Sequence, residues 1–256
     1  MAIVNVTPDS FSGDGVDGDV GAAAELARRF EAEGADLIDI GGESSRPGAE
    51  ELDPAEELAR ILPAIEAVRA ATALPISVDT YHASVAEAAL ERGATIVNDI
   101  WGLRRDPRMA AVVARYGAAL VAMHNQRGRA HHDVIGDIRA GFEATLELAA
   151  AAGIDRGKII ADPGFGFGWK PEQNLEMLRR LRELWDLELP LLVGTSRKST
   201  LGLVLDAEVH DRLEGTAATV ALAIAGGADI VRVHDVRQMR RVARMSDAIV
   251  RANWRS

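Results

Sequence analysis

Short apolar runs that each end on polar residues recur along the chain, and this pattern constrains the fold more than any other feature. In a barrel of parallel strands joined by helices, the carboxyl ends of all strands meet at one rim, and active sites lie there. The pattern therefore predicts a barrel, and it predicts that the functional residues lie at the rim formed by the carboxyl ends of the strands. The polar residues that end or directly follow the apolar runs are Asn5, Asp79, Asn98, Asp99, His124, Asp162, Ser196, Arg197, Lys198, Arg232 and His234.

A weak internal repeat also favours parallel strands. A glycine followed by alanine stands between a helical pattern and an apolar run at Gly34, Gly93, Gly117 and Gly227. Glycine ends helices there because it readily adopts the left-handed conformation. Eight strands are predicted, near residues 2–5, 36–41, 75–79, 95–99, 118–123, 158–162, 190–194 and 229–234.

Eight strands alternating with helices in 256 residues match the size of a (β/α)8 TIM barrel. We therefore expect an α/β fold with a single domain over residues 1–256 and an active site at the C-terminal rim of the strands. An open doubly wound sheet is the alternative, but no G-x-G-x-x-G motif follows the first strand. Segments 7–20, 42–53, 125–137 and 163–173 each follow a strand, so we expect them to form long rim loops.

Composition narrows the possible partners and location. The formal net charge is -10, which argues against nucleic acid and anionic membranes as partners. There is no cysteine, so thiolate metal sites and disulfides are excluded. No apolar run is long enough for a membrane span, and the N-terminus lacks the features of a signal peptide. We expect a cytoplasmic protein.

The last predicted strand carries a cation and an imidazole on one side. Because side chains alternate along a strand, Arg232 and His234 point together, away from Val231 and Val233. This pair suits an anion, and phosphate above all. The alternative is an arginine bound to a loop acid beside a structural histidine.

Acids and an amide end three other strands, at Asp79, Asn98 and Asp162. Two carboxylates and an amide around one volume would suit a ligand with several N–H groups, such as a fused heterocycle with an amino-amidine edge. Each residue alone could equally be a polar group at the barrel mouth. We assign Asp39, in the middle of its strand, to an interior polar network.

Two loop features add to this site, and a third does not. In the string from Asp162 to Gly168, two aromatic residues alternate with glycines, so both rings can lie against a flat ligand while the backbone approaches it closely. After the seventh strand, Lys198 can serve a ligand while Arg197 remains structural. The pair His131 and His132 lacks the further ligands of a metal site, so we expect it to be solvent-exposed.

Taken together, these strings resemble the dihydropteroate synthase family of pterin-binding TIM barrels. The resemblance spans nearly the whole chain in order, and its longest strings are highly specific. It is carried by residues 3–12, 39–49, 77–80, 97–100, 123–124, 162–168, 194–199 and 232–236.

The resemblance implies a transferase of folate biosynthesis, in a family targeted by sulfonamides. The reaction would join 6-hydroxymethyl-7,8-dihydropterin diphosphate to p-aminobenzoate, giving 7,8-dihydropteroate and diphosphate by a dissociative, SN1-like displacement. It implies a pterin site of Asp79, Asn98, Met123, Asp162, Phe167 and Lys198; a diphosphate site of Asn5, Ser45, Arg46, Arg232 and His234; and a p-aminobenzoate site of Phe11, Pro47, Phe167 and Ser199.

Further roles follow from the same resemblance. Lys198, Arg232 and His234 would be the catalytic residues, Asn5 would be the protein ligand of Mg²⁺, and the chain would form a homodimer. Loops 7–20 and 42–53 would close over the reaction and exclude water. The alternatives are a pterin-binding methyltransferase on the same barrel and a catalytically silent pterin-binding paralogue.

Overall fold

A computed structural model describes residues 1–6, 20–43 and 51–252 of the chain. Phe11, Ser45, Arg46 and Pro47 lie outside the described residues, as do most of the two loops expected to close over the reaction. No helix among the described residues is both long enough and apolar enough to cross a membrane.

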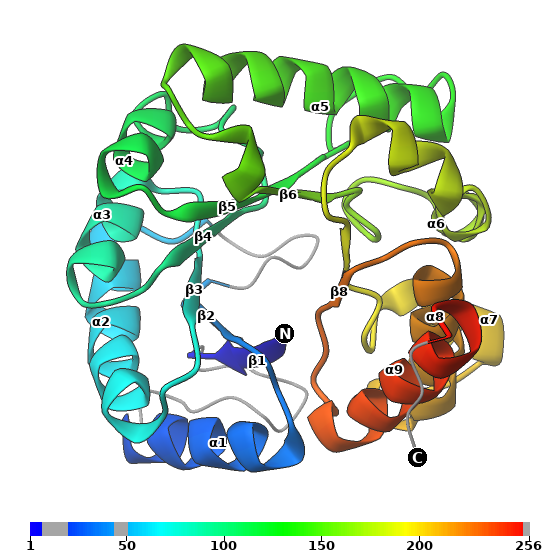
Figure 1. Ribbon diagram of the computed structural model, residues 1–256, viewed down its shortest axis with the longest axis horizontal. Coiled ribbons are helices and arrows are strands. Elements are labelled where there is room, and N and C mark those ends of the chain that lie inside the picture. The colour runs from blue at the N-terminus through cyan, green and yellow to red at the C-terminus, as the bar shows by residue number, and fades with distance from the viewer. Residues whose placement is uncertain (7–19, 44–50, 253–256) are drawn as a thin grey trace.

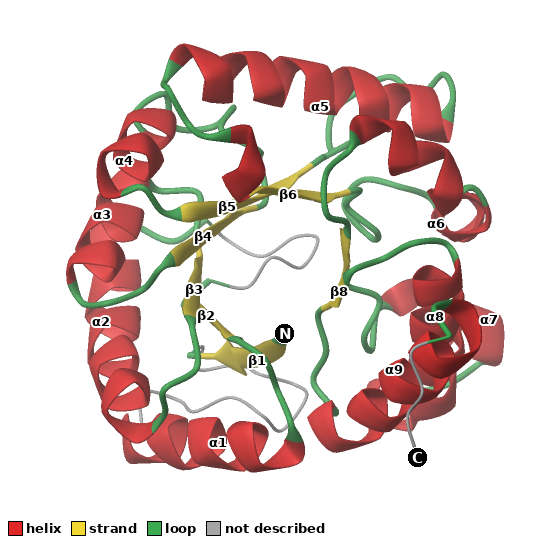
Figure 2. Ribbon diagram, in the orientation of Figure 1, coloured by secondary structure: helices red, strands yellow, loops and turns green. Residues whose placement is uncertain are grey.

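The eight predicted strands are present and form a (β/α)8 barrel (Figures 1 and 2). Strands β1 to β6 pair in parallel in chain order, and β7 pairs in parallel with β8. Bridges between Ala161 and Leu191 and between Ala2 and Val233 join the two sheets into a closed ring. The strands are β1 Ala2–Asn5, β2 Ile38–Gly41, β3 Ile76–Asp79, β4 Ile96–Asp99, β5 Ala119–Met123, β6 Ile159–Asp162, β7 Leu192–Val193 and β8 Ile230–Val231.

Helices surround the strands as an outer ring (Figure 1). The α-helices are α1 Val20–Glu33, α2 Pro54–Ala71, α3 Ala83–Glu91, α4 Met109–Tyr116, α5 Val134–Ala151, α6 Pro171–Arg179, α7 Ser199–Leu205, α8 Leu213–Ala225 and α9 Val236–Val250. Short 3₁₀ helices lie at η1 Arg156–Lys158, η2 Leu181–Leu187 and η3 Val209–Asp211.

Local sequence explains where the helices begin and end. The Asp53 side chain accepts a hydrogen bond from the backbone N–H of Ala55, and Pro54 follows at the first helical position, so α2 begins there. Each repeat glycine has the expected positive φ, with values of 91° at Gly34, 99° at Gly93, 59° at Gly117 and 106° at Gly227. The repeat therefore marks successive helix-to-strand turns.

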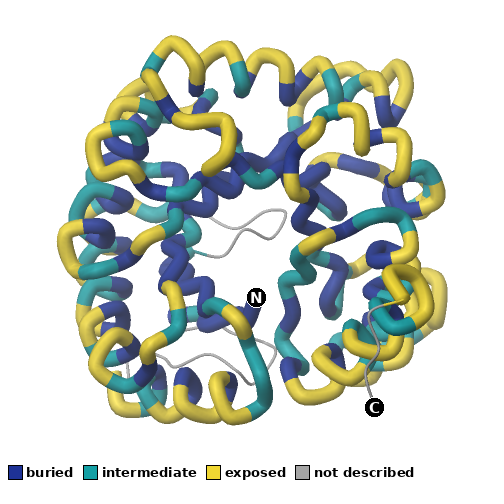
Figure 3. Tube along the Cα trace, viewed as in Figure 1, coloured by how far each residue is buried: buried dark blue, intermediate teal, exposed yellow. Residues whose placement is uncertain are grey.

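Alternation along the strands divides the barrel into two apolar regions. One side of each strand packs against the helices in the main core, as Val4, Ile40 and Val97 do. The opposite side belongs to a separate interior cluster that includes Met1, Val121 and Leu192. In Figure 3 most of the strand residues are buried, whereas β8 is of intermediate burial and the outer faces of the helices are exposed. Polar side chains on the interior side can therefore meet only at the barrel's centre.

Strands β7 and β8 are shorter than the predicted 190–194 and 229–234. Pro190 has no N–H to donate to a ladder, although its carbonyl accepts a bond from Ala161 N–H. Beyond Val231, the chain is held to β1 by single bonds, including the 3.2 Å bond from Ile3 N–H to the Val233 carbonyl. Regular pairing therefore stops before the residues predicted to carry the chemistry.

Candidate active site

One register row of the barrel places four residues side by side at the C-terminal rim. Asn5 pairs with Gly41, Gly41 with Asp79, and Asp79 with Asn98. All four occupy the interior side of their strands. Three polar residues that the sequence predicted at strand ends therefore line one wall of the barrel mouth, and a side chain on the glycine between them would crowd Asp79.

Arg232 reaches across the barrel to this wall. Its Nε lies 2.6 Å from Asp39 Oδ2, and its Nη2 lies 2.7 Å from Asp79 Oδ2. Asp39 Oδ2 also accepts a 3.0 Å bond from Asn98 Nδ2. The polar network predicted for Asp39 is confirmed, and the partners of Arg232 are strand acids rather than a loop acid.

Burial controls the ionisation of Asp79. Loss of hydration raises its pKa to about 7, and the neighbouring charge of Asp39 acts in the same direction. The Arg232 guanidinium opposes both effects. The carboxyl group of Asp79 is therefore poised to gain or lose a proton near neutral pH.

Asp162 and Lys198 face the same interior space from β6 and from the turn before α7. Burial raises the pKa of Asp162, while the Lys198 ammonium opposes this rise. Burial in turn lowers the pKa of Lys198 to about 8, against the attraction of Asp162. Asp162 Oδ1 accepts a 2.8 Å bond from Gly164 N–H, and Lys198 Nζ donates to the Phe165 carbonyl.

A small apolar cluster borders these charges. It contains Met123 and Phe167 together with Tyr81 and Ile100. Lys198 Nζ lies 4.6 Å from the centre of the Phe167 ring, and the Arg127 guanidinium carbon lies 5.0 Å from the same centre. Phe167 therefore offers an apolar surface next to two cations, as a flat, electron-rich ligand would require.

The glycine-rich string differs from the prediction in two respects. Phe165 is fully buried in the main core, so only Phe167 is placed to face a ligand. The glycines admit protein rather than ligand: a Cβ on Gly164 would lie 1.9 Å from the His124 carbonyl oxygen, and one on Gly168 would lie 2.4 Å from the Arg127 nitrogen. Their role is to let two rim loops pack closely together.

The turns after β7 and β8 are tied to each other. His234 Nδ1 lies 3.0 Å from Ser196 Oγ, which also accepts a bond from His234 N–H. Arg197 makes a bidentate ion pair with Asp235, with distances of 3.0 and 2.6 Å. The structural role predicted for Arg197 is confirmed. These bonds hold the imidazole of His234 at the same rim as Arg232.

Two further expectations concern exposed residues. Ser199 is exposed at the start of α7, directly after Lys198. The side chains of His131 and His132 are 37 % and 75 % exposed, as predicted, and both face Asp137. Asp137 supplies a nearby carboxylate that the sequence interpretation had not placed there.

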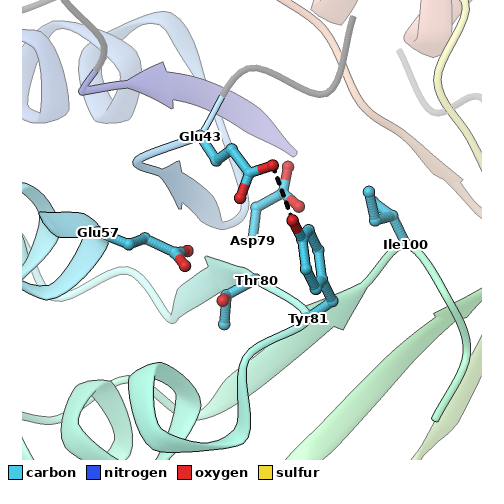
Figure 4. Close-up of a pocket in the computed structure, with 6 residues that line it drawn as sticks. All are labelled: Glu43, Glu57, Asp79, Thr80, Tyr81 and Ile100. Carbon is cyan, nitrogen blue, oxygen red and sulfur yellow. Dashed lines mark hydrogen bonds between the residues drawn. The ribbon is translucent and has the colours of Figure 1, made fainter. Parts of the chain in front are cut away.

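Sequence reasoning missed a cluster beside Asp79, shown in Figure 4. A pocket is lined by Glu43, Glu57, Asp79, Thr80, Tyr81 and Ile100. The Tyr81 hydroxyl donates a 2.9 Å bond to Glu43 Oε1, and His82 Nδ1 lies 2.7 Å from Glu57 Oε2. One sequence signal could have revealed this cluster. Glu57 lies four residues before Ile61, on the buried face of α2, where a charged residue is unexpected.

Comparison with known proteins agrees with this geometry. Residues 1–234 match the family described as Pterin binding enzyme, so the chain belongs to that family of enzymes. A curated relative in Bacillus subtilis (strain 168), named dihydropteroate synthase, is 46 % identical over 250 residues, covering 98 % of this chain and 88 % of the relative.

Solved structures show the same likeness. A dihydropteroate synthase from Clostridium difficile, crystallised in the presence of pteroic acid, superposes with a TM-score of 0.94 at 50 % identity, covering 98 % of this chain and 96 % of that one. The Xanthomonas albilineans dihydropteroate synthase with 4-aminobenzoic acid gives 0.91 at 41 % identity, covering 97 % and 92 %.

Proposed function

We infer that this chain catalyses the dihydropteroate synthase reaction, in which p-aminobenzoate displaces diphosphate from 6-hydroxymethyl-7,8-dihydropterin diphosphate. The observation that carries this function is the meeting of acids and cations in one barrel mouth, where Arg232 bonds to both Asp39 and Asp79. The relatives named above support the same substrates, since one was crystallised in the presence of pteroic acid and another with 4-aminobenzoic acid.

The pterin site that we propose comprises Asp79, Asn98, Met123, Asp162, Phe167 and Lys198. Asp162 is buried and Asp79 is half-buried, and both carboxylates can accept N–H bonds from an amino-amidine edge; such charge-assisted bonds are strong. Asn98 is fixed by its bond to Asp39. Met123 and Phe167 belong to the apolar cluster that would pack against the ring.

The diphosphate site that we propose comprises Asn5, Ser45, Arg46, Arg232 and His234. Arg232 has five N–H groups, and its two bonds to carboxylates engage only Nε and Nη2, so it retains donors for an anion. His234 is held at the same rim by Ser196. Ser45 and Arg46 enter this site by resemblance alone, since they lie outside the described residues.

The surroundings of Asn5 fit Mg²⁺. Asn5 is half-buried on the interior side beside Gly41, and a Cβ on that glycine would lie 3.3 Å from the Cβ of Asp79. A side chain at Gly41 would therefore crowd this row. The amide oxygen of Asn5 is a hard donor that suits Mg²⁺, which often takes one protein ligand with phosphate and water for the rest. When bound, Mg²⁺ would stabilise negative charge on the diphosphate oxygens.

For p-aminobenzoate we propose contacts from Phe167 and Ser199, together with Phe11 and Pro47. Ser199 follows Lys198 directly and is exposed, so p-aminobenzoate could reach its hydroxyl without displacing buried side chains. Phe11 and Pro47 are proposed by resemblance alone. Phe167 would then border both substrates, which places the amine next to the carbon that it attacks.

The proposed catalytic residues are Lys198, Arg232 and His234. The dihydropterin ring can delocalise positive charge, so cleavage of the C–O bond runs ahead of attack by the amine. Arg232 and His234 stabilise the departing diphosphate, while the carboxylates of Asp79 and Asp162 stabilise the cationic ring. Lys198 orients the ring. The amine loses its proton after the C–N bond forms, so no strong base is required.

We further propose a cytoplasmic homodimer. Most of the large apolar side chains that are exposed in the described residues lie on three C-terminal helices: Leu203, Val204 and Leu205 on α7, Leu222 on α8, and Met245, Ile249 and Val250 on α9. Helices α8 and α9 pack directly together. A second copy of the chain is the occupant that we propose for this surface.

The proposed reaction is tested by diphosphate release from the pterin diphosphate, with and without p-aminobenzoate and Mg²⁺. We expect release that requires the amine and yields 7,8-dihydropteroate in equal amount. Pterin binding without release would instead indicate a silent paralogue. Methyl transfer from a folate without any use of the diphosphate would indicate the methyltransferase.

A further inference from the structure

The cluster beside Asp79 contains three groups that can bind a metal ion. One ligand atom each from Glu43, Glu57 and His82 lies within 4.8 Å of the others. The three come from different elements, since Glu43 follows β2, Glu57 lies in the first turn of α2, and His82 precedes α3. In Figure 4 the carboxylates of Glu43 and Glu57 both point into the pocket, toward Asp79.

Two carboxylate oxygens in this cluster, Glu43 Oε2 and Glu57 Oε1, have no hydrogen-bond partner among the described residues, and Glu57 is the more deeply buried of the two side chains. Glu57 is 1 % exposed, and its Oε1 has no hydrogen bond within the described part of the chain, although the Thr80 hydroxyl lies near enough to favour the charged form. Its other oxygen, Oε2, meets His82 Nδ1 at 2.7 Å. A buried carboxylate oxygen without a partner is costly. Its orientation into the pocket therefore calls for a cation or a proton there.

The surrounding charge favours a cation. Carboxyl groups of Glu43, Glu57 and Asp79 line this pocket together. Arg232 bonds to Asp79 from the barrel side, while the bonds described for the two glutamates come from His82 and Tyr81. Like charges at such short range repel strongly at low dielectric. A bound dication would compensate this repulsion.

We propose that Glu43, Glu57 and His82 bind a transition-metal dication of the zinc class, at a site separate from the Mg²⁺ site proposed at Asn5. Two carboxylates and one imidazole form a mixed oxygen and nitrogen donor set, which suits Zn²⁺ or Co²⁺ better than Mg²⁺. The bond from Tyr81 to Glu43 Oε1 orients one ligand, as outer-shell groups do around metals.

The site lies behind the proposed pterin pocket. Glu57 and Glu43 both raise the pKa of Asp79, although less than burial does. A dication between the glutamates and Asp79 would offset that effect and keep Asp79 ionised to lower pH. Metal binding itself needs neither pterin nor diphosphate, so the site can be tested independently of the proposed reaction.

The test uses the full chain after treatment with a chelator, without substrates. Zn²⁺ affinity is measured by competition with a coloured chelator, and Co²⁺ absorption serves as a spectroscopic probe. We expect one tight equivalent in the wild type that Mg²⁺ does not displace. Glu57→Gln and His82→Gln should each weaken Zn²⁺ binding at least about tenfold, because each removes a ligand.

The chain supplies its own matched control, since His131, His132 and Asp137 form an exposed cluster elsewhere. The double variant His131→Gln and His132→Gln should bind Zn²⁺ as the wild type does. If that variant loses the metal, or if no variant changes the affinity, or if the wild type binds none, the proposal is wrong.

A second route covers variants that fail to fold by circular dichroism. Glu43→Gln alters a half-buried residue, and X-ray absorption can be measured on the wild type loaded with zinc. One imidazole among oxygen ligands would support the site. Oxygen ligands alone, or two imidazoles, would overturn it.

Discussion

Arg232 is the residue at which the two halves of the proposed active site meet. It bonds to Asp79 in the proposed pterin site and to Asp39, which in turn holds Asn98. A charge at this position serves two purposes, because it stabilises buried carboxylates and offers further donors to an anion. Removing it would disturb pterin binding as well as diphosphate binding.

The ionisation of Asp79 and Lys198 predicts a bell-shaped pH dependence. Asp79, with a pKa of about 7, becomes an N–H acceptor only as the pH rises through that value. Lys198, with a pKa of about 8, loses its charge as the pH rises further. Affinity for a bare pterin should therefore rise through pH 7 and fall above pH 8.

Calorimetry across this pH range measures the profile directly. Lys198→Arg keeps a positive charge at high pH, so any binding that it retains should lose the alkaline decline. A profile that stays flat for the wild type from about pH 5 to about pH 10 would contradict the assignment of both residues.

Asp162→Asn should weaken pterin binding by about 1.5–3 kcal/mol, the range for a hydrogen bond to a charged group. The amide keeps the shape of the side chain but loses the charge and one acceptor. Asp155→Asn is a matched control at the opposite end of β6, where the exposed Asp155 accepts a bond from Gly157 N–H. Equal pterin affinity of wild type and Asp162→Asn in calorimetry would remove Asp162 from the site.

At the scale of single elements, α5 provides a test of how the helices support the rim. Gly141 packs against His124, and a Cβ at this position would lie 1.9 Å from His124 Nδ1. His124 is 1 % exposed and directly follows β5. Gly141→Ala should therefore destabilise the fold by about 1–3 kcal/mol, as overpacking does. Urea unfolding measures the change.

The same helix contains the control for this prediction. In Gly136→Ala the new Cβ would make an ordinary contact, 3.4 Å from Asp133 Oδ2. This substitution should be neutral or stabilising by up to about 1 kcal/mol, because alanine has a higher helix propensity than glycine. If both variants unfold at the same urea concentration, the prediction that Gly141 must be a glycine because it packs closely on His124 is wrong.

At the scale of the whole molecule, the apolar surface on α7, α8 and α9 predicts a dimer that a single charge can separate. Ile249 on α9 is 70 % exposed, and Ile249→Glu would place a carboxylate in the interface. Light scattering should give the mass of two chains for the wild type and of one chain for the variant. Leu148→Glu, on α5 and 42 % exposed in the wild type, should remain dimeric.

The barrel could be predicted from sequence because its causes are local. Apolar runs and turn glycines recur in each unit, and alternation along a strand places Asp79 and Asn98 on the same side. The structural role of Arg197, next to Lys198, could also be predicted from the sequence. The size of the chain then left few folds to consider.

The partners within the site could not be predicted, because they depend on distant contacts. Asp39 lies 193 residues from Arg232, and Glu57 lies 25 residues from His82. Phe165 and Phe167 share one local pattern, yet Phe165 packs into the main core while Phe167 belongs to the small cluster at the site. The close packing of two rim loops likewise explains why glycines are needed within the glycine-rich string, and this packing is also a distant contact.

The central claim is that heterocycle and diphosphate occupy one cavity, and a crystal structure with a pterin and diphosphate tests it most directly. We predict that the pterin's amino-amidine edge contacts Asp79, Asn98 and Asp162, while diphosphate contacts Arg232 and His234 within the same barrel mouth. Diphosphate bound away from Arg232, or a pterin bound outside the row of strand acids, would contradict the account.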